Sequence, residues 1–542
     1  MWIALVVSLF LLWDNWQVYN GGSSLFRRDE PKGASTKKAE PSAIPAGPTA
    51  AASAPIGSTP SAPIAQAENV SITTDVVKAD FSTAGGVLTR LELLKHNDKV
   101  DPSKHQVLFD DAPGKPYLAQ SGLTGGTFPN HKTIFKVQPG PRALDGSDTL
   151  QLVMTAEQGG VVLTKTYTFQ RGSYVIGIRH DVANRTGAPI DPAVYLQLVR
   201  HGERPEGESR FVSTFTGPAV YTEADKFKKL DYDKIEEKGK EEHTTKTDNG
   251  WVALVQHYFL TALIAPDKAE REIYTRKLDT KLYAIGNILP LGTVAPGATA
   301  SSEARLFAGP QESAVLEKTA PGLELVKDYG MLTVIAKPIF WLMTQIQKEV
   351  RNWGWTIVLL TVLIKLAFYP LASASYRSMA NMKKVMPQIK ELQERYKDDK
   401  MKRNQEVMAL YKTEKINPLG GCMPVVVQIP VFLSLYWVLL ASVEMRNAPW
   451  IGWITDLAVP DPFYILPIIM AVSMFVQQRM SPPPPDPMQA KMMMFMPLAF
   501  SVTFFFFPAG LVLYWVVNNL LSIAQQSWIN YSFEKSKKKR AA

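Results

Sequence analysis

The residue best placed to do chemistry is a lysine inside a long apolar run. In WGWTIVLLTVLIKLAFYPLASASYR, Lys365 lies twelve residues from Trp353 and twelve from Arg377. Because a helix rises about 1.5 Å per residue, this lysine would lie near the middle of a bilayer. Its insertion there costs about 2.5–3.5 kcal/mol, so we expect the ammonium to have a function. The chemistry that it offers is the reversible binding of an anionic group.

Other polar residues of the apolar runs could surround this ammonium. Thr361 lies four residues before Lys365, which places both on one helical face. Further amides occur in two later runs, at Gln428, Asn518, Asn519, Gln525 and Gln526. If these faces converge, the helices enclose a polar, wetted cavity. In the alternative interpretation, Lys365 extends to the cytoplasmic interface and the amides join neighbouring helices.

The residue patterns of known catalytic and metal sites do not occur in the sequence. The seven histidines all precede the last apolar runs and show no metal-ligand spacing. No Walker motif, nucleophile elbow or Gly-rich dinucleotide turn is found. We therefore predict that the protein is not an enzyme and that it needs neither a metal nor a cofactor.

Composition divides the chain into a mixed, polar first part and an apolar second part. Hydrophobic residues make up 46% of the 542 residues, yet the mean hydropathy is only −0.06. A chain of this length is expected to form two or more domains. Its single cysteine, Cys422, excludes an internal disulfide. Much of the net charge of +9 flanks apolar runs, which favours anionic lipid over DNA as a partner.

The first 66 residues are expected to form an anchor and a linker. The run MWIALVVSLFLLWDNW ends in aromatic residues, and no small-residue cleavage site follows closely. We predict an uncleaved transmembrane anchor at 1–20, with a cleaved signal peptide as the alternative. Residues 21–66 are rich in Pro, Ala and Ser and cannot bury a core, so we predict a disordered linker.

A β-rich domain is predicted over residues 67–323. TLQLVMTAEQGGVVLTKTYTFQRGSYVIGIRHDV contains three alternating runs separated by Gly159-Gly160 and Gly172. SITTDVVKADFS and WVALVQHYFLTALIAP have the same character. Short strands without intervening amphipathic helices favour a large antiparallel sandwich. The insertion EADKFKKLDYDKIEEKGKEEHTTKTD is expected to be a solvated loop.

From Glu324 onward the hydrophobic period becomes helical. Residues 324–352 carry an apolar stripe, which predicts an amphipathic helix in the membrane interface, with an ordinary packed helix as the alternative. Five apolar segments follow, and we predict one span at 353–375 and four more within 417–530. The segments 463–478 and 492–507 are about sixteen residues long, so they are short for a bilayer of about 30 Å and would thin it locally.

The distribution of Lys and Arg predicts the orientation of these spans. Residues 376–416 contain eleven Lys and Arg, whereas the loop 444–462 contains only Arg446. The basic loop and the tail 531–542 are therefore expected in the cytoplasm, and the β domain on the outer side. An uncleaved anchor then places the N-terminus in the cytoplasm.

The basic loop 376–416 reads as a helical hairpin that turns near Asp398-Asp399. One arm carries an apolar stripe and the other arm opposes it; the stripe comprises Met379, Met382, Met386, Ile389, Leu392 and Tyr396, and the opposing residues are Val407, Met408 and Tyr411. Methionine adapts to varied apolar partners, so this surface would suit nascent hydrophobic segments. The alternative is an antiparallel pair packed only on itself. The basic tail would contact ribosomal RNA or lipid, or serve only to fix the topology.

Several segments resemble a known family. Four segments are similar to the YidC/Oxa/Alb membrane-protein insertases of the Gram-negative inner membrane: NWGWTIVLLTVLIKLAFYPL, MALYKTEKINPLGGCMPVVVQIPVFLSLYWVL, DPFYILPIIM and FPAGLVLYWVVNNL. A fifth, GWVALVQHYFLTA, resembles the periplasmic domain of these insertases. The resemblance implies a multi-pass α-helical membrane protein with six spans, a five-helix core and a periplasmic all-β supersandwich. It also implies a cationic hydrophilic groove open to cytoplasm and lipid. The implied partners are nascent membrane proteins, the Sec translocon (SecYEG and SecDF), the ribosome and membrane lipids.

Two residues depart from the family pattern. Lys365 occupies a position that is often Arg, which keeps the charge but loses the bidentate fork. Trp515 follows Tyr514 where a second Tyr is common, so a hydroxyl is lost. The residues assigned to the groove are Lys365, Thr361, Gln428, Tyr514, Trp515 and Asn518.

The sequence hypothesis is a non-enzymatic insertase. A hydrophobic client segment would slide along two spans, with contacts at Val431, Phe432, Leu435, Phe500 and Phe504, while its polar flank enters the groove. One alternative is a secondary transporter that binds an anionic solute at Lys365, although no repeated halves are evident. Another is a sugar-binding β domain on a simple anchor, for which five further spans are excessive.

Overall fold

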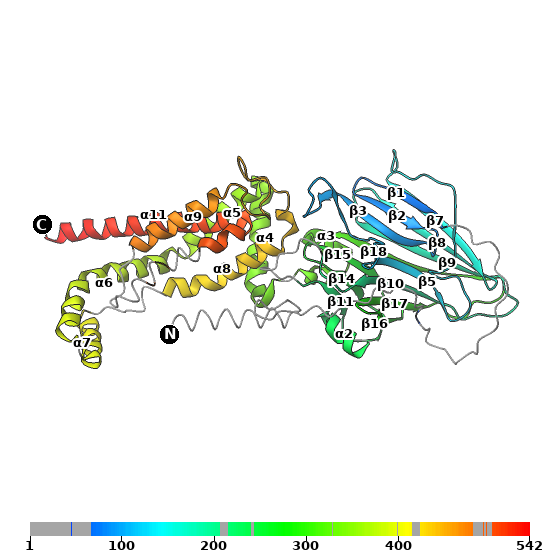
Figure 1. Cartoon of the computed structure of the whole chain (residues 1–542), viewed down its shortest axis with the longest axis horizontal. Helices are drawn as coiled ribbons and strands as arrows, with labels where there is room; N and C mark the ends of the chain where they lie inside the picture. The colour runs from blue at the N-terminus through cyan, green and yellow to red at the C-terminus, as the bar shows by residue number, and fades with distance from the viewer. Residues whose placement is uncertain are drawn as a thin grey trace. The chain divides into compact units, whose positions relative to one another are not determined.

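The computed structural model describes residues 45, 67–205, 215–239, 243–327, 329–397, 399–414, 423–480, 492, 495 and 501–541 (Figure 1). The predicted anchor at 1–20, nearly all of the linker at 21–66, Cys422 and Phe500 lie outside these residues. The chain divides into two compact units, Met1–Lys327 and Asp328–Ala542.

The first unit contains two nine-stranded sheets, in which the paired strands are antiparallel. The first sheet consists of β1 (Asn69–Thr73), β2 (Val77–Ser82), β3 (Val87–Asn97), β4 (His105–Val107), β5 (Tyr117–Thr124), β10 (Ala193–His201), β13 (Lys246–Thr247), β16 (Arg271–Asp279) and β17 (Leu282–Pro290). The second consists of β6 (Lys136–Val137), β7 (Thr149–Gln158), β8 (Val161–Gln170), β9 (Val175–Asn184), β11 (Gly217–Thr222), β12 (Lys226–Lys229), β14 (Trp251–Val255), β15 (Phe259–Ile264) and β18 (Thr299–Pro310).

The alternating runs form the strands that their pattern predicts. Strands β7, β8 and β9 pair in order, and buried residues alternate along β7. Gly159 and Gly160 at the first turn have φ of 62° and 73°, and Gly172 at the second has φ of 69°. Glycine adopts this left-handed region without strain, so these residues permit the tight reversals. The predicted antiparallel sandwich is confirmed.

The charged insertion at 223–248 is not the solvated loop that we predicted. It contains β12, the helix α2 (Tyr232–Lys238) and β13, although residues 240–242 lie outside the described ranges. Asp231 caps α2 by accepting a hydrogen bond from the backbone N–H of Asp233. Ile235 and Leu230 are each only 1% exposed. These two apolar side chains anchor an otherwise polar segment to the domain.

A polar cluster lies within the sandwich core. Lys165 is 0% exposed, and its Nζ donates hydrogen bonds to the carbonyl oxygens of Gly85 and Ser121, each at 2.7 Å. His180 is also 0% exposed, with its Nε2 at 2.9 Å from Ser121 Oγ. Burial lowers the pKa of Lys165 to about 7 and that of His180 to about 3. Both groups therefore couple the stability of the domain to pH.

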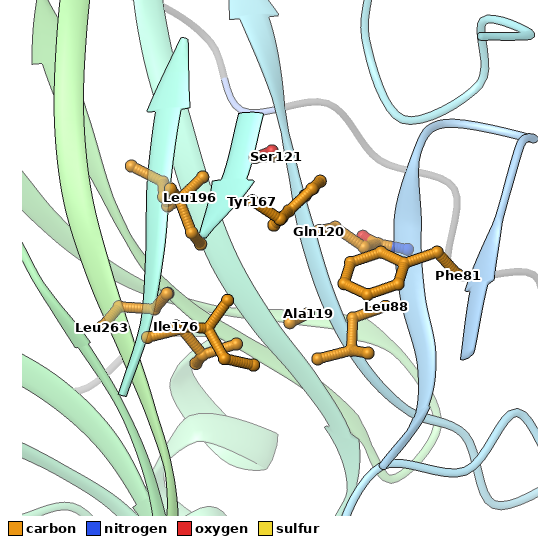
Figure 2. A pocket seen from close by; sticks show the side chains of 11 residues that line it. Phe81, Leu88, Ala119, Gln120, Ser121, Tyr167, Ile176, Leu196 and Leu263 are labelled. Carbon is orange, nitrogen blue, oxygen red and sulfur yellow. The ribbon is translucent and has the colours of Figure 1, made fainter. Parts of the chain in front are cut away.

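A small cavity lies beside this cluster (Figure 2). Phe81 and Leu88 line it from β2 and β3, and Ile176 lines it from β9. Ser121 and Gln120 are its main polar neighbours. The lining is mostly apolar, so this cavity belongs to the packing between the sheets.

The first unit ends with α3 (Ser313–Thr319) and the 3-10 turn η1 (Leu323–Val326), and the second unit is helical. Its described helices are α4 (Thr333–Val350), α5 (Trp353–Ala367), α6 (Tyr369–Arg395), α7 (Lys400–Thr413), α8 (Met423–Ala441), α9 (Ile465–Met480) and α11 (Ala509–Ala541), with a 3-10 turn η4 at Phe504–Phe506. Helices α4, α5, α8, α9 and α11 share one core, which includes Ile357, Leu435, Met470 and Val512.

The helix boundaries differ from the prediction at two places. The span predicted at 353–375 is broken at Phe368, where α5 and α6 bend by 66°. Pro370, at the start of α6, has no backbone N–H and cannot continue the hydrogen-bond ladder of α5. The predicted last span and the basic tail instead form the single helix α11.

Taken alone, none of the described helices is both long enough and apolar enough to cross a bilayer, whereas α5 and α6 meet that requirement together as a bent pair.

Candidate functional site

Lys365 lies on α5 and contacts α11 through one serine. Its side chain is half-buried, and Nζ donates a hydrogen bond to Ser522 Oγ at 2.7 Å. The Ser522 hydroxyl in turn donates to the carbonyl oxygen of Asn518 at 2.7 Å. Within the described ranges, no Asp or Glu forms an ion pair with Lys365. The site therefore presents a cation that has a hydroxyl partner but no counter-ion.

Ser522, the hydrogen-bond partner of Lys365, is not among the groove residues predicted from the sequence. It lies four residues after Asn518, so the two share a face of α11. That spacing could have identified it, because the same rule paired Thr361 with Lys365. The sequence prediction instead rests on the amides of the same run, which are larger polar groups than a serine hydroxyl.

The other predicted groove residues have different environments. Thr361 is 1% exposed, and its hydroxyl donates to the Ile357 carbonyl at 2.7 Å, so it is satisfied within its own helix. Gln428 on α8 and Asn518 on α11 are half-buried. The described contacts join Lys365 to α11 and leave Thr361 bonded within α5, so the wetted surface expected on their shared helical face stays a prediction.

An aromatic cluster joins α8, η4 and α11. Phe432 packs against Trp515 with ring centroids 4.6 Å apart, and against Tyr514 at 6.1 Å. Phe504 contacts Trp515 at 5.6 Å. The two predicted groove aromatics thus contact two of the residues that we assigned to client binding.

Two predicted client contacts are core residues in this structure. Leu435 is 0% exposed and Phe504 is 1% exposed, so neither presents a surface to a client. Val431 and Phe432 are half-buried, and Phe500 lies outside the described residues. Among the described residues of these segments, the exposed apolar positions include Ile429, Leu433, Val502 and Phe506. All faces of α8 are apolar, so the sequence could not show which face is turned inward.

The predicted hairpin consists of α6 and α7. Asp399 caps α7 by accepting a hydrogen bond from the Lys402 backbone N–H at 2.9 Å. The packed residues are Val385, Ile389 and Tyr411, with Met386, Val407 and Leu410 around them. Met379 and Met382 are half-buried, while Met408 is 50% exposed. Met408 thus lies on the outer surface rather than opposite the stripe, which corrects its predicted place.

The loop between α8 and α9 is organised by a buried carboxylate. Asp461 is 1% exposed and accepts hydrogen bonds from Trp453 Nε1 at 3.0 Å and from the backbone N–H groups of Phe463 and Leu466 at 3.0 and 2.8 Å. The carbonyl of Leu457, in the same loop, accepts from the Gly510 N–H at 2.9 Å. This loop therefore caps the first turn of α11.

These features define a class of protein: one with an antiparallel β domain and a helical unit in which, among the described residues, Lys365 lies in an apolar helix with a serine and no carboxylate as its partner. Residues 69–342 match the family described as the YidC periplasmic domain, and residues 345–538 match the family described as the 60Kd inner membrane protein. The chain belongs to the YidC family of membrane protein insertases. It is accordingly an inner-membrane protein with a periplasmic domain.

The similarity to curated relatives extends over nearly the whole chain. A membrane protein insertase YidC of Janthinobacterium sp. (strain Marseille) is 57% identical over 97% of both chains. That of Ralstonia nicotianae is 56% identical and covers 100% of this chain and 99% of its own. A solved structure of an active YidC insertase with its first transmembrane domain aligns with 85% of this chain and 92% of its own, at 18% identity and a TM-score of 0.41.

Proposed function

We propose that this protein inserts nascent membrane proteins into the inner membrane by lowering a barrier rather than by catalysing a reaction. The observation that carries the proposal is Lys365, a half-buried ammonium between α5 and α11 that bonds to Ser522 and to no carboxylate of the described chain. Such a cation is costly to keep among apolar helices, so it is expected to serve an anionic ligand. The acidic flank of a client segment supplies that anion.

The topology that suits this function has six spans, with both termini in the cytoplasm and the β domain in the periplasm. Its support is the concentration of Lys and Arg in 376–416. A cytoplasmic opening would give clients access to Lys365, so we place a hydrophilic groove on that side. Gln428, Asn518 and the aromatic residues Tyr514 and Trp515 are its further proposed walls.

Clients are proposed to dock first on the hairpin of α6 and α7, where Met379, Met382, Met386 and the exposed Met408 offer adaptable apolar contacts. The hydrophobic segment then moves along the exposed apolar side chains Ile429, Leu433, Val502 and Phe506. Val431 and Phe432 flank this path. Leu435 and Phe504 support it from within the core.

The energetics favour capture followed by release. A carboxylate about 4 Å from the ammonium gains roughly 1–4 kcal/mol, depending on the local dielectric. That gain is enough to recruit a polar flank and too small to trap it. Burial of the client's apolar segment in lipid, at about 0.8 kcal/mol per CH₂, then drives release. No cofactor takes part in these steps.

The proposed partners are nascent membrane proteins, ribosomes that deliver them, membrane lipids, and the Sec translocon (SecYEG and SecDF). The basic hairpin at 376–416 lies between two apolar segments in the sequence, which supports nascent membrane proteins and ribosomes as partners. DNA is not among the proposed partners.

Site-specific crosslinking tests the client path. A photoreactive residue would be placed at the exposed positions 429, 433, 502 and 506, and at the buried positions 435 and 504 as matched controls from the same segments. With a stalled nascent membrane protein, the exposed positions should form crosslinks and the buried ones should form few. Equal crosslinking at both sets would contradict the proposed path.

A further inference from the structure

The hydroxyl of Ser522 joins two helices. It accepts a hydrogen bond from Lys365 Nζ of α5 at 2.7 Å and donates one to the Asn518 carbonyl of its own helix α11 at 2.7 Å. Ser522 itself is only 3% exposed. One small side chain thus connects α5, the first half of the bent α5–α6 pair, to α11.

The direction of these bonds fixes what Ser522 can offer. A hydroxyl has one hydrogen and two acceptor lone pairs. Because its hydrogen points to Asn518, the oxygen faces Lys365 only as an acceptor. An acceptor in this place holds the N–H donors of Lys365 in one orientation. An ammonium has three such donors, so two remain for a ligand.

We propose that Ser522 is a positioning residue, which holds the Lys365 ammonium where the carboxylate of an acidic client flank can bind its two remaining N–H donors. This inference rests on the proposed function of Lys365 as the cation that receives client flanks. Without the serine, the long lysine side chain is free to extend toward the interface, where water screens its charge.

The helical unit contains a matched control for this serine. Ser473 of α9 is 4% exposed, donates to the Met470 carbonyl at 2.7 Å and accepts a hydrogen bond from Asn519 of α11 at 3.2 Å. It therefore also joins a neighbouring helix to α11 through a buried hydroxyl. Unlike Ser522, it forms none of its described hydrogen bonds with Lys365.

The test compares Ser522→Ala, Ser522→Thr, Ser473→Ala and Lys365→Met in the full-length protein, reconstituted in vesicles. Two single-span clients are used, identical except that the translocated tail carries three Asp or three Asn, and protease protection of the tail measures insertion. Ser522→Ala should slow the Asp client about tenfold while changing the Asn client less than about twofold. Ser522→Thr, which keeps the hydroxyl, should restore the rate.

The outcomes separate this inference from the proposed function. If Ser522→Ala slows both clients equally, or no more than Ser473→Ala does, the serine has only a structural role and the positioning inference is wrong. If Lys365→Met slows the Asp client and Ser522→Ala does not, the positioning inference fails while the role of the cation stands. If Lys365→Met leaves the Asp client unchanged, the proposed function of Lys365 itself fails.

Discussion

Replacing Lys365 should reduce insertion in proportion to the negative charge of the client. Lys365→Met keeps the apolar length of the side chain and removes the ammonium, while Lys365→Arg keeps the charge. We expect the Met variant to fold, because Ser522 retains its hydrogen bond to Asn518 when the lysine is gone. Any loss of activity in that variant therefore reports on the charge.

The magnitude follows from Coulomb's law at contact distance. A carboxylate about 4 Å from the ammonium gains about 1 kcal/mol in water and about 4 kcal/mol at an effective dielectric constant of 20. Lys365 is half-buried, so the value should lie between these limits. Since about 1.4 kcal/mol changes a rate tenfold, Lys365→Met should slow a client with one acidic flanking residue by a factor between about 5 and several hundred. Lys365→Glu should slow it further, because it substitutes repulsion for attraction.

The assay is complementation in cells depleted of the resident insertase, followed by pulse-labelling of a client whose tail becomes accessible to protease outside. A client with an uncharged tail serves as the control and should insert at the wild-type rate in every variant. Wild-type insertion of an acidic client by the Lys365→Glu protein would refute the electrostatic reasoning.

Three further perturbations test other parts of the structure. Because burial lowers the pKa of His180 to about 3, its unfolded form binds a proton more readily, so it should reduce the stability of the β domain as pH falls below 6.5, by about 2 kcal/mol at pH 5. His131 of the same domain, whose pKa burial lowers to about 4, acts in the same direction, so hydrogen exchange of β8 and β9 should show a smaller loss in His180→Asn than in wild type. An equal loss in both proteins would contradict the role of His180. Burial lowers the pKa of Lys165 from 10.5 to about 7, so the unfolded chain binds this proton more readily and the stability of the β domain should rise as the pH increases from 7 to 10. Lys165→Met should remove this rise in stability. An equal rise in the variant would contradict the assignment of the effect to Lys165. Asp461→Asn replaces a carboxylate that accepts three N–H groups by an amide with one acceptor oxygen. This substitution should destabilise the helical unit by about 1.5–3 kcal/mol and make the 446–464 loop sensitive to protease. Unchanged protease resistance would show that the carboxylate is dispensable.

The sequence predicted the secondary-structure elements whose hydrophobic pattern is compatible with only one kind of structure. Alternation with glycine turns at Gly159-Gly160 and Gly172 specified β7 to β9, because a half-buried strand must alternate. Leu435 shows the limit of this reasoning. Its helix is apolar on every side, so no periodicity distinguishes the face that packs on α4 and α11 from the face that is exposed.

Local signals and tertiary contacts also differ in what they reveal. Pro370 is a local signal for the break at Phe368. The prediction of one continuous span gave more weight to the hydrophobicity of the run than to this proline. The bond between Lys365 and Ser522 joins residues 157 positions apart, and nothing in either segment alone specifies that pair. The same holds for the buried Asp461, which the sequence presents only as a charge in a loop.

The most direct measurement of the central claim, that the cation at position 365 can be reached from the cytoplasm, uses the Lys365→Cys variant with Cys422→Ser. A membrane-impermeant maleimide added to the cytoplasmic side should label position 365 much faster than it labels a cysteine in place of the fully buried Leu435. Labelling of position 365 only by a lipid-soluble maleimide, or only from the periplasmic side, would contradict the account.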